Sequence, residues 1–319
     1  MSSRLSQFAV SLKKEFPEEV LLAESLKEYT TYEVGGPAPA FCRPETRECL
    51  QQMIRRCAAE RIPFYVLGSG SNVLVNDAGI EMIVLQLSHC CRKIYHEGRR
   101  VFAGAGAQVS ALVEYCEEYD LAGLDFMSGI PGTVGGALRM NAGAFVGEIG
   151  DRVELVEAFT GAGEYREVPA DAAGFGYRRA DHLQDLVLLG CRLQMLAGSR
   201  SELQNARQEY LSKRAAKQPL DYGSCGSVFK RPPGNYAGTL IEKAGCKGLQ
   251  VGGAMVSPKH ANFIVNYRQA SARDIYNLIT EVQQTVYRKF NVWLELEVKL
   301  LGFSKEEERR VRGPQEQTI

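Results

Sequence analysis

Three short segments carry side chains of the kinds that act on a negatively charged ligand. SCGSVFKRPP, at 224–233, places the Ser227 hydroxyl close in sequence to Lys230 and Arg231. FGYRR, at 175–179, carries two guanidinium groups, and LELEVK, at 294–299, carries two carboxylates. A planar guanidinium binds a carboxylate through two hydrogen bonds. The segments therefore predict either an anion site or ordinary charged surface turns.

A serine-hydrolase site is one alternative for Ser227. Such a nucleophile stands in a G-x-S-x-G elbow. The residues around Ser227 do not have this pattern, and the histidines that could serve as a base are His89, His96, His182 and His260. We therefore do not interpret Ser227 as a hydrolytic nucleophile.

Two glycine-rich segments predict a bound diphosphate. GSGSN, at 68–72, lies between two apolar stretches, and its successive backbone N–H groups would form an anion-binding nest. SGIPGTVGGALRMNAGAFVGEIG, at 128–150, has seven glycines and three alanines among 23 residues, which favours close approach of the backbone to a bulky ligand. The first segment alone fits a hairpin loop equally well. Together the two point to a flavin dinucleotide held between them.

A third segment contains a pair of glycines, and we interpret it as a plain tight turn. FAGAGAQVSALVEYC leads from an expected strand through Gly104 and Gly106 into a helix. A dinucleotide fingerprint requires a third glycine for close packing of helix on strand, and that position holds Val109. The sequence therefore does not predict a Rossmann site here.

The composition limits the partners. The chain has 319 residues, 45% of them apolar, and its 38 basic residues balance 38 acidic ones, so no overall field attracts nucleic acid or an anionic membrane. The nine cysteines have no CxxC spacing and are interpreted as reduced core thiols.

We find no signal peptide and no run of 18 apolar residues, and expect a cytoplasmic protein. The sequence carries no information on oligomeric state, and a monomer is the working expectation.

The motifs, in this order, resemble known families. LGSGSNVLV with SGIPGTVGGALRMNAGA resembles the FAD-binding domain of vanillyl-alcohol oxidase-type flavoproteins. With FGYRR, GSVFKRP, KHANFIVN and LELEVKLLG, the chain from Thr30 to Gly302 resembles the UDP-N-acetylenolpyruvoylglucosamine reductases, of their shorter second type. The cofactor-binding residues implied by the resemblance are Leu67, Gly68, Ser69, Gly70, Ser71, Asn72, Ser128, Pro131, Gly132, Thr133, Gly135, Gly136 and Asn141.

The resemblance implies NADPH-dependent, FAD-mediated reduction of UDP-N-acetylglucosamine enolpyruvate to UDP-N-acetylmuramate. This step belongs to peptidoglycan precursor synthesis, and so to cell-wall biogenesis, cell shape and cell division. Hydride addition to the enolpyruvyl ether builds negative charge on its carboxylate and leaves a carbon to be protonated. The resemblance assigns Arg178, rather than Arg179, to the carboxylate and Glu297, rather than Glu295, beside it. Ser227 is then the proton donor, since an enolate carbon is basic enough to deprotonate a hydroxyl.

The resemblance also implies which residues contact the substrate, and the chain differs from the longer type of the family in one loop. The implied substrate-binding residues are Tyr177, Lys217, Lys230 and Arg231, although each cation alone also fits a solvated basic surface. His260 and Asn262 are interpreted as structural because they precede an apolar strand. Only the eight residues 179–186 separate Arg178 from VLLGCRL, so the extra loop of the longer type is missing and the way the site closes is undetermined. NADPH and the UDP-sugar are expected to use one cleft in turn.

Two other functions stay open. An oxidase of the same flavin fold would use oxygen and ignore UDP, and a non-catalytic nucleotide-sugar binding protein would hold no flavin.

The elements that position these motifs follow from hydrophobic spacing. We expect helices over 4–16, 46–61, 110–123, 199–217, 239–245 and 272–289, and strands within 64–75, 83–105, 153–196, 249–256, 262–267 and 292–303. The expected fold class is α+β, a two-lobed FAD-binding domain plus a C-terminal α+β substrate-binding domain. The expected bounds are an N-terminal helix at 1–19, FAD-binding lobes at about 20–86 and 87–200, a substrate-binding domain at 201–303 and a disordered polar tail at 304–319.

Overall fold

The computed structural model describes residues 3–145 and 147–313, and packing divides this part of the chain into two compact units. The first unit consists of the chain up to Ala23, Pro39–Ser69 and Met82–Arg214; the second consists of Glu24–Ala38, Gly70–Glu81 and the chain from Ala215. These bounds differ from the expected ones. Residues 201–214 pack with the first unit, and two early segments join the second because their residues pair or pack with its C-terminal elements.

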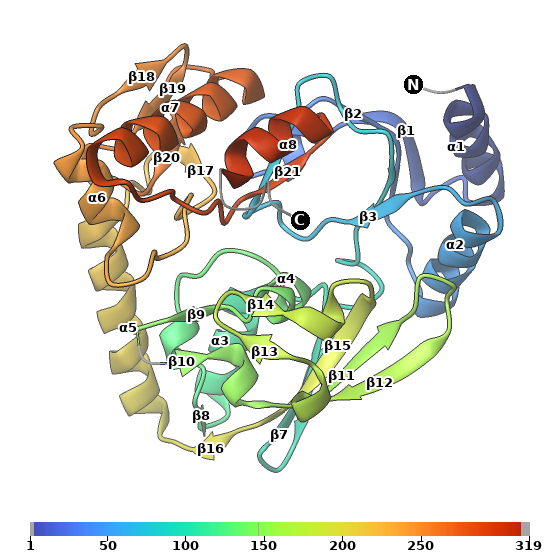
Figure 1. Ribbon diagram of the computed structural model, residues 1–319. Helices are drawn as coiled ribbons and strands as arrows, with labels where there is room; N and C mark the ends of the chain where they lie inside the picture. The colour runs from blue at the N-terminus through green and yellow to red at the C-terminus, as the bar shows by residue number, and fades with distance from the viewer. Residues whose placement is uncertain (1–2, 146, 314–319) are drawn as a thin grey trace. The chain divides into compact units, whose positions relative to one another are not determined.

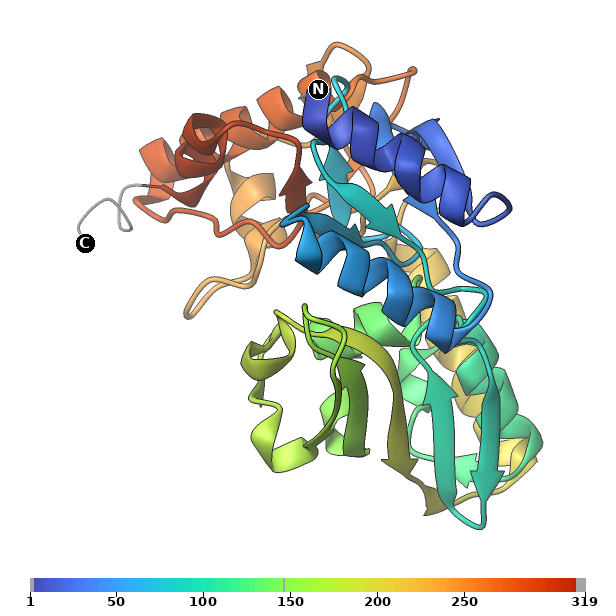
Figure 2. The ribbon, with the colours of Figure 1, turned by 90° about the vertical axis from the view of Figure 1, so that its right-hand side faces the viewer.

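The N-terminal part of the first unit is a small sheet with two helices. The sheet has the order β1-β2-β5-β3, and β5 pairs in parallel with both β2 and β3. Thr46 caps the second helix by accepting a 3.1 Å hydrogen bond from the Cys49 N–H. Figure 2 shows both helices, in blue, beside these strands. The elements are α1 (Ser3–Glu15), β1 (Val20–Ser25), β2 (Pro37–Cys42), α2 (Arg47–Ala59), β3 (Phe64–Val66) and β5 (Ile83–Leu85).

The rest of the first unit is built on an antiparallel five-stranded sheet. Its order is β12-β11-β15-β7-β6, and a core of 26 buried apolar residues from Val101 to Met195 covers it. Its elements are β6 (Ile94–Glu97), β7 (Arg100–Gly104), α3 (Val109–Glu118), β8 (Leu121–Ala122), η2 (Asp125–Met127), α4 (Val134–Arg139), β9 (Gly143–Ala144), β10 (Gly147–Glu148), η3 (Ile149–Asp151), β11 (Val153–Phe159), β12 (Tyr165–Pro169), η4 (Ala170–Ala172), β13 (Phe175–Gly176), β14 (Arg179–Ala180), η5 (Asp181–Leu183), β15 (Val187–Gln194), β16 (Leu196–Ala197) and α5 (Arg200–Lys217).

The second unit packs one long helix on a four-stranded sheet. The sheet has the order β17-β20-β19-β18, and α7 lies against it (Figure 1). Ile275, Leu278, Ile279, Val282 and Val286 recur at helical spacing and are buried in its core. The elements are η1 (Leu26–Tyr29), β4 (Val73–Val75), β17 (Gly223–Ser224), α6 (Ala237–Lys243), β18 (Gln250–Val251), β19 (Ala254–Val256), β20 (Ile264–Asn266), α7 (Ala272–Phe290), β21 (Lys299–Leu301) and α8 (Lys305–Arg312).

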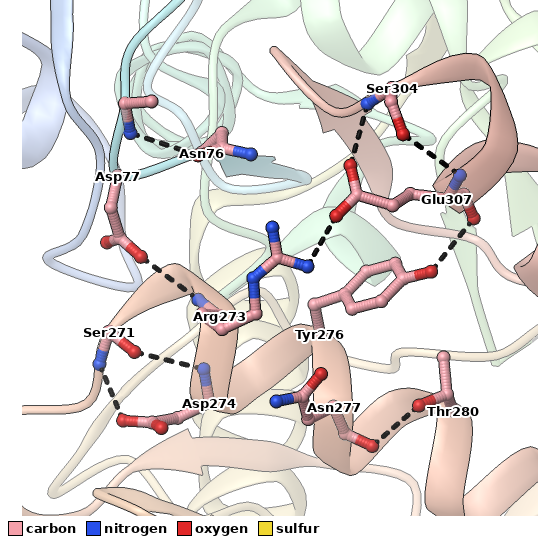
Figure 3. A network of polar contacts seen from close by, with 11 residues as sticks. Asn76, Asp77, Ser271, Arg273, Asp274, Tyr276, Asn277, Thr280, Ser304 and Glu307 are labelled. Carbon is pink, nitrogen blue, oxygen red and sulfur yellow. Dashed lines mark hydrogen bonds and ion pairs between the residues drawn. The ribbon is translucent and has the colours of Figure 1, made fainter.

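Polar contacts at the start of α7 tie distant segments of this unit together (Figure 3). Ser271 and Asp274 form a capping box, and the Asp77 carboxylate accepts hydrogen bonds of 2.8 Å and 3.1 Å from the N–H groups of Ala272 and Arg273. Since Asp77 follows β4, these bonds anchor 70–81 in the second unit.

Two expectations for the C-terminal region are wrong. Residues 305–312 form α8, which is held to α7 by an ion pair between Arg273 and Glu307 and a 3.0 Å hydrogen bond from the Tyr276 hydroxyl to the Glu307 carbonyl (Figure 3). Sequence analysis missed this helix because its residues are polar apart from Val311, which is buried in the core of the unit. The strand expected over 292–303 is only Lys299–Leu301, and residues 314–319 of the expected tail lie outside the described residues.

The nine cysteines all occur as free thiols, seven of them buried. Burial raises the pKa of the Cys57, Cys116 and Cys225 thiols to about 12. The buried thiols thus belong to the packing of the two units. Within residues 3–145 and 147–313, no helix combines the length and apolar character that crossing a membrane requires.

Candidate active site

The two glycine-rich segments of the sequence meet in the first unit at Gly68 and Thr133. A Cβ added to Gly68 would lie 2.6 Å from the Thr133 Oγ1, which is closer than real Cβ atoms come. Thr133 in turn caps α4, since its hydroxyl accepts a 3.3 Å hydrogen bond from the Gly136 N–H. Only glycine at position 68 lets the two loops approach this closely.

A third segment, Ala105–Val109, lines the same place. Backbone hydrogen bonds of 2.8 Å join Gly135 N–H to Ala105 and Val134 N–H to Ala107, and one of 2.9 Å joins Val109 N–H to Gly132. The Ser69 hydroxyl donates to the Gln108 side-chain oxygen at 3.1 Å. Sequence analysis interpreted this segment as a plain tight turn and did not assign it to the cofactor site. Its glycines, Gly104 and Gly106, are needed for close packing against the backbone of Cys91 and Leu87. Cβ atoms on Gly104 and Gly106 would lie 2.3 Å and 2.1 Å from the carbonyl oxygens of Cys91 and Leu87.

These three segments fit a dinucleotide such as FAD. Gly68, Ala105 and Gly135 carry no side chain larger than a methyl group, which lets the three backbone segments pack closely. Ser69, Gln108 and Thr133 add side-chain oxygens beside it. Of the predicted cofactor residues, those that belong to the first unit are Leu67, Gly68, Ser69, Ser128, Pro131, Gly132, Thr133, Gly135, Gly136 and Asn141.

The other predicted cofactor residues, Gly70, Ser71 and Asn72, belong to the second unit. A Cβ on Gly70, whose φ is +63°, would lie 2.0 Å from the Tyr29 carbonyl oxygen. The Asn72 amide donates a 3.3 Å hydrogen bond to the Glu297 carbonyl. The hairpin-loop alternative for 68–72 is wrong, because β3 pairs with β5 while β4 pairs with β21.

Arg178 stands at the tip of a two-residue turn in the first unit. Gly176 pairs with Arg179 and Phe175 with Ala180, so Tyr177 and Arg178 form the loop of the β13–β14 hairpin. Arg178 has φ +56°, a left-handed conformation that L residues rarely adopt. Its side chain is half-buried, whereas that of Tyr177 is exposed. Strained backbone of this kind concentrates at functional sites.

Asn141 forms a hydrogen bond with the backbone of this hairpin. Its buried amide group donates hydrogen bonds of 3.1 Å to the Gly176 carbonyl and 2.6 Å to the Glu148 carboxylate, and its oxygen accepts a 2.9 Å bond from the Gly150 N–H. The structure thus places Asn141 against the Arg178 hairpin, although the sequence assigned it to the cofactor alone.

Ser227 and Glu297 lie on segments that pair in the second unit. The Glu297 N–H donates to the Val228 carbonyl at 2.8 Å, and the Lys230 N–H donates to the Glu295 carbonyl at 2.9 Å, around an antiparallel bridge between Phe229 and Leu296. The pairing brings a residue adjacent to Ser227 into direct contact with Glu297. Both Ser227 and Glu297 are half-buried.

Asn262 supports the same loop, as its structural interpretation requires. Its side-chain oxygen accepts a 3.1 Å hydrogen bond from the Phe229 N–H, and its Nδ2 donates a 2.9 Å bond to the Phe229 carbonyl. Its own carbonyl accepts from the Val228 N–H at 2.9 Å. His260 accepts from the Asn262 N–H at 3.3 Å, and burial lowers the pKa of its imidazole, with a further lowering by Lys247 and Lys217. Asn262 therefore positions the loop at 228–229, and His260 supports Asn262.

The predicted cations of the second unit have different surroundings. The Lys230 ammonium forms an ion pair with Glu295, the carboxylate that the sequence offered as an alternative to Glu297. The Arg231 guanidinium lies 4.0 Å from the centre of the exposed Tyr236 ring. Lys217 is exposed at the end of α5. Arg178 belongs to the first unit and Ser227, Glu297 and these cations to the second.

Comparison with known proteins identifies what the chain is similar to. A family model described as "FAD binding domain" matches residues 38–169, and one described as "UDP-N-acetylenolpyruvoylglucosamine reductase, C-terminal domain" matches residues 218–301. The reductase of that name from Clostridioides difficile is 40% identical over 286 residues, 89% of this chain and 94% of the relative. The one from Listeria monocytogenes serotype 4b is 40% identical over 92% of this chain and 99% of the relative. The crystal structure of the Thermus caldophilus reductase matches with a TM-score of 0.77 and 37% identity, covering 89% of this chain and 98% of that chain.

Proposed function

Because the chain belongs to the UDP-N-acetylenolpyruvoylglucosamine reductase family, we infer that it is a flavin-dependent oxidoreductase that reduces UDP-N-acetylglucosamine enolpyruvate to UDP-N-acetylmuramate with electrons from NADPH. The observation that carries this function is 40% identity over 89% of the chain to a reductase so named. The α+β fold and the Gly68–Thr133 cradle support it, since the activity requires FAD.

When bound, FAD would supply hydride transfer from NADPH to the vinyl carbon of the substrate. The residues of the cradle, Gly68, Ser69, Gln108, Thr133 and Gly135, would hold the dinucleotide through backbone groups and hydroxyls.

Arg178 binds the substrate carboxylate in this proposal. Hydride addition converts the carboxylate into an enediolate, so its oxygens gain negative charge. A guanidinium fixed at the tip of a short hairpin stabilises that charge without rearranging at the moment of reaction. Tyr177, next to it in the turn, is proposed to contact the same substrate.

Ser227 is proposed to donate the proton that completes the reduction, and Glu297 is proposed to act as the acid partner of the reacting carboxylate. The support for this pair is the backbone pairing of 228 with 297, which gives the two side chains a common scaffold. A serine hydroxyl has a high pKa, so it protonates only a strongly basic carbon such as the enediolate.

Lys217, Lys230 and Arg231 are proposed to bind the diphosphate of the UDP group. Lys230 already pairs with Glu295, so binding phosphate would require its ammonium to share or exchange partners. Arg231 is oriented along the Tyr236 ring by a cation–π contact. We further propose that the protein acts as a monomer in the cytoplasm in peptidoglycan precursor synthesis, and so supports cell shape and division.

A half-reaction experiment tests the function. Purified protein should be yellow, should lose its flavin absorbance when NADPH is added without oxygen, and should regain it when UDP-N-acetylglucosamine enolpyruvate is added. Release of hydrogen peroxide from an alcohol, with no response to the UDP-sugar, would instead indicate an oxidase. Colourless protein that binds UDP and cannot be reconstituted with FAD would indicate a binding protein.

A further inference from the structure

Arg214, near the C-terminal end of α5, is held by contacts with a segment distant in the sequence. Its side chain is half-buried, while those of Lys213 and Ala215 are exposed. Its Nε donates a 2.7 Å hydrogen bond to the Ser128 carbonyl in the glycine-rich segment of the cradle. A Cβ on Gly129, whose φ is +74°, would lie 2.8 Å from the Arg214 Cδ. Ser128 and Gly129 therefore fix where this guanidinium lies.

Part of this guanidinium lacks a protein partner. Its Nη2 is buried, and no hydrogen-bond acceptor for it occurs among the residues that the structure describes. The ion pairs recorded along α5 join Arg207 to Glu117 and Lys213 to Glu209, and none in the described chain includes Arg214. An arginine cannot lose its charge inside a protein, so a buried donor of this kind is unfavourable until an acceptor reaches it.

The charge that acts on the pKa of Arg214 is that of another guanidinium. Burial lowers the pKa of Arg214, and the positive charge of Arg178 lowers it further. The Arg214 Cζ lies 5.6 Å from the centre of the Phe145 ring, which packs at a tilt against Tyr210 with 4.6 Å between ring centres. Two like charges repel one another, and an anion bound by both cations reverses the sign of that energy.

We propose that Arg214 is a second guanidinium for the carboxylate that Arg178 binds. The inference rests on the proposed function, because the carboxylate is that of the enolpyruvyl substrate and of its lactyl product. A carboxylate has two oxygens with about four lone-pair sites, so two guanidinium groups can bind it at once. As the enediolate forms, its growing charge meets two fixed cations, which favours the transition state over the bound substrate.

The test compares ligands with and without the carboxylate on three variants. Arg214→Met removes the charge and keeps the length of the side chain, Arg214→Lys keeps the charge and loses the planar fork, and Lys213→Met removes an exposed cation one residue away. Each is loaded with FAD, and its flavin content and melting temperature are checked against the wild type. Calorimetry then measures the binding of UDP-N-acetylmuramate, which carries the carboxylate, and of UDP-N-acetylglucosamine, which does not.

Arg214→Met should weaken UDP-N-acetylmuramate binding about 10- to 100-fold, which is the range of a charge-assisted hydrogen bond, and should leave UDP-N-acetylglucosamine binding unchanged. Arg214→Lys should fall between Arg214→Met and the wild type, and Lys213→Met should match the wild type. Anaerobic reduction of the flavin by NADPH should keep its rate in Arg214→Met, while reoxidation by the enolpyruvyl substrate slows.

Three results would overturn the inference. Equal loss for both ligands would place Arg214 at the UDP group or in the scaffold. Unchanged binding of both would remove it from the site. A changed flavin reduction potential with unchanged product binding would mean that Arg214 serves the reduced flavin. These outcomes differ from failure of the proposed function itself, in which the wild-type flavin would not be reoxidised by the enolpyruvyl substrate at all.

Discussion

The Asn141 Nδ2 donates a 3.1 Å hydrogen bond to the carbonyl oxygen of Gly176, two residues before Arg178. Asn141 is itself buried and in a left-handed conformation with φ +41°. The bond connects the end of the glycine-rich segment to the hairpin that carries the proposed carboxylate-binding residue. A buried amide with three polar contacts defines one position for that hairpin.

Replacing Asn141 should therefore weaken the binding of the substrate more than the binding of the flavin. In Asn141→Gly, which tolerates the positive φ, the lost hydrogen bonds leave buried groups unpaired, and stability should fall by about 1–3 kcal/mol. KM for the UDP-sugar should rise and kcat fall, with FAD still bound. Steady-state kinetics and flavin content measure this. Loss of FAD with unaltered KM in the loaded fraction would favour a role toward the cofactor alone.

The Gly68–Thr133 contact predicts a coupled pair of substitutions. Gly68→Ala should cost about 1–3 kcal/mol, because its methyl group overlaps the Thr133 hydroxyl, and should weaken FAD retention. In a Thr133→Ala background the added cost should be smaller, since the obstructing oxygen is gone. Thermal unfolding of the four proteins measures the coupling. Gly161→Ala is the control, because a Cβ there meets no atom within 4 Å; additive costs would contradict the contact.

Ser227→Ala should separate the two half-reactions. Flavin reduction by NADPH needs no proton from Ser227 and should keep its rate. Reoxidation by the enolpyruvyl substrate should slow by about 10²- to 10⁴-fold, the usual contribution of a general acid. Anaerobic stopped-flow absorbance follows both steps. Ser224→Ala, in the same loop, is the matched control and should resemble the wild type; equal slowing of both half-reactions would remove Ser227 from proton transfer.

His260 predicts a stability change at mildly acidic pH. Burial lowers the pKa of its imidazole below the ordinary value of 6.5, so the unfolded chain binds more protons than the folded one in that range. The contribution of His260 is present above the unfolded pKa and is lost as the pH falls toward the folded one. Denaturant unfolding of the wild type and His260→Asn at pH 7.5 and 5.5 should therefore give a smaller stability difference at pH 5.5. A difference that grows on acidification would reverse the sign of the shift.

The amino-acid sequence by itself pointed to the cofactor class, because the glycine-rich runs around Gly68 and Thr133 are local signals that depend on residue type and short spacing. The proposed reacting side chains Arg178, Ser227 and Glu297 came from the resemblance of their motifs to a known family. Amphipathic patterns also predicted α2 and α7 closely, because their buried faces recur at the helical period.

Contacts between distant segments could not be read in this way. Arg214 is one cation among many on α5 until Ser128, Gly129 and Phe145 surround it. Asn141 became a support for the Arg178 hairpin, and the polar residues 305–312 became a helix docked on α7. Sequence spacing specifies which groups a chain has and which local element carries them. Tertiary structure decides which buried polar group meets which partner, because a buried donor must find an acceptor wherever in the chain that acceptor lies.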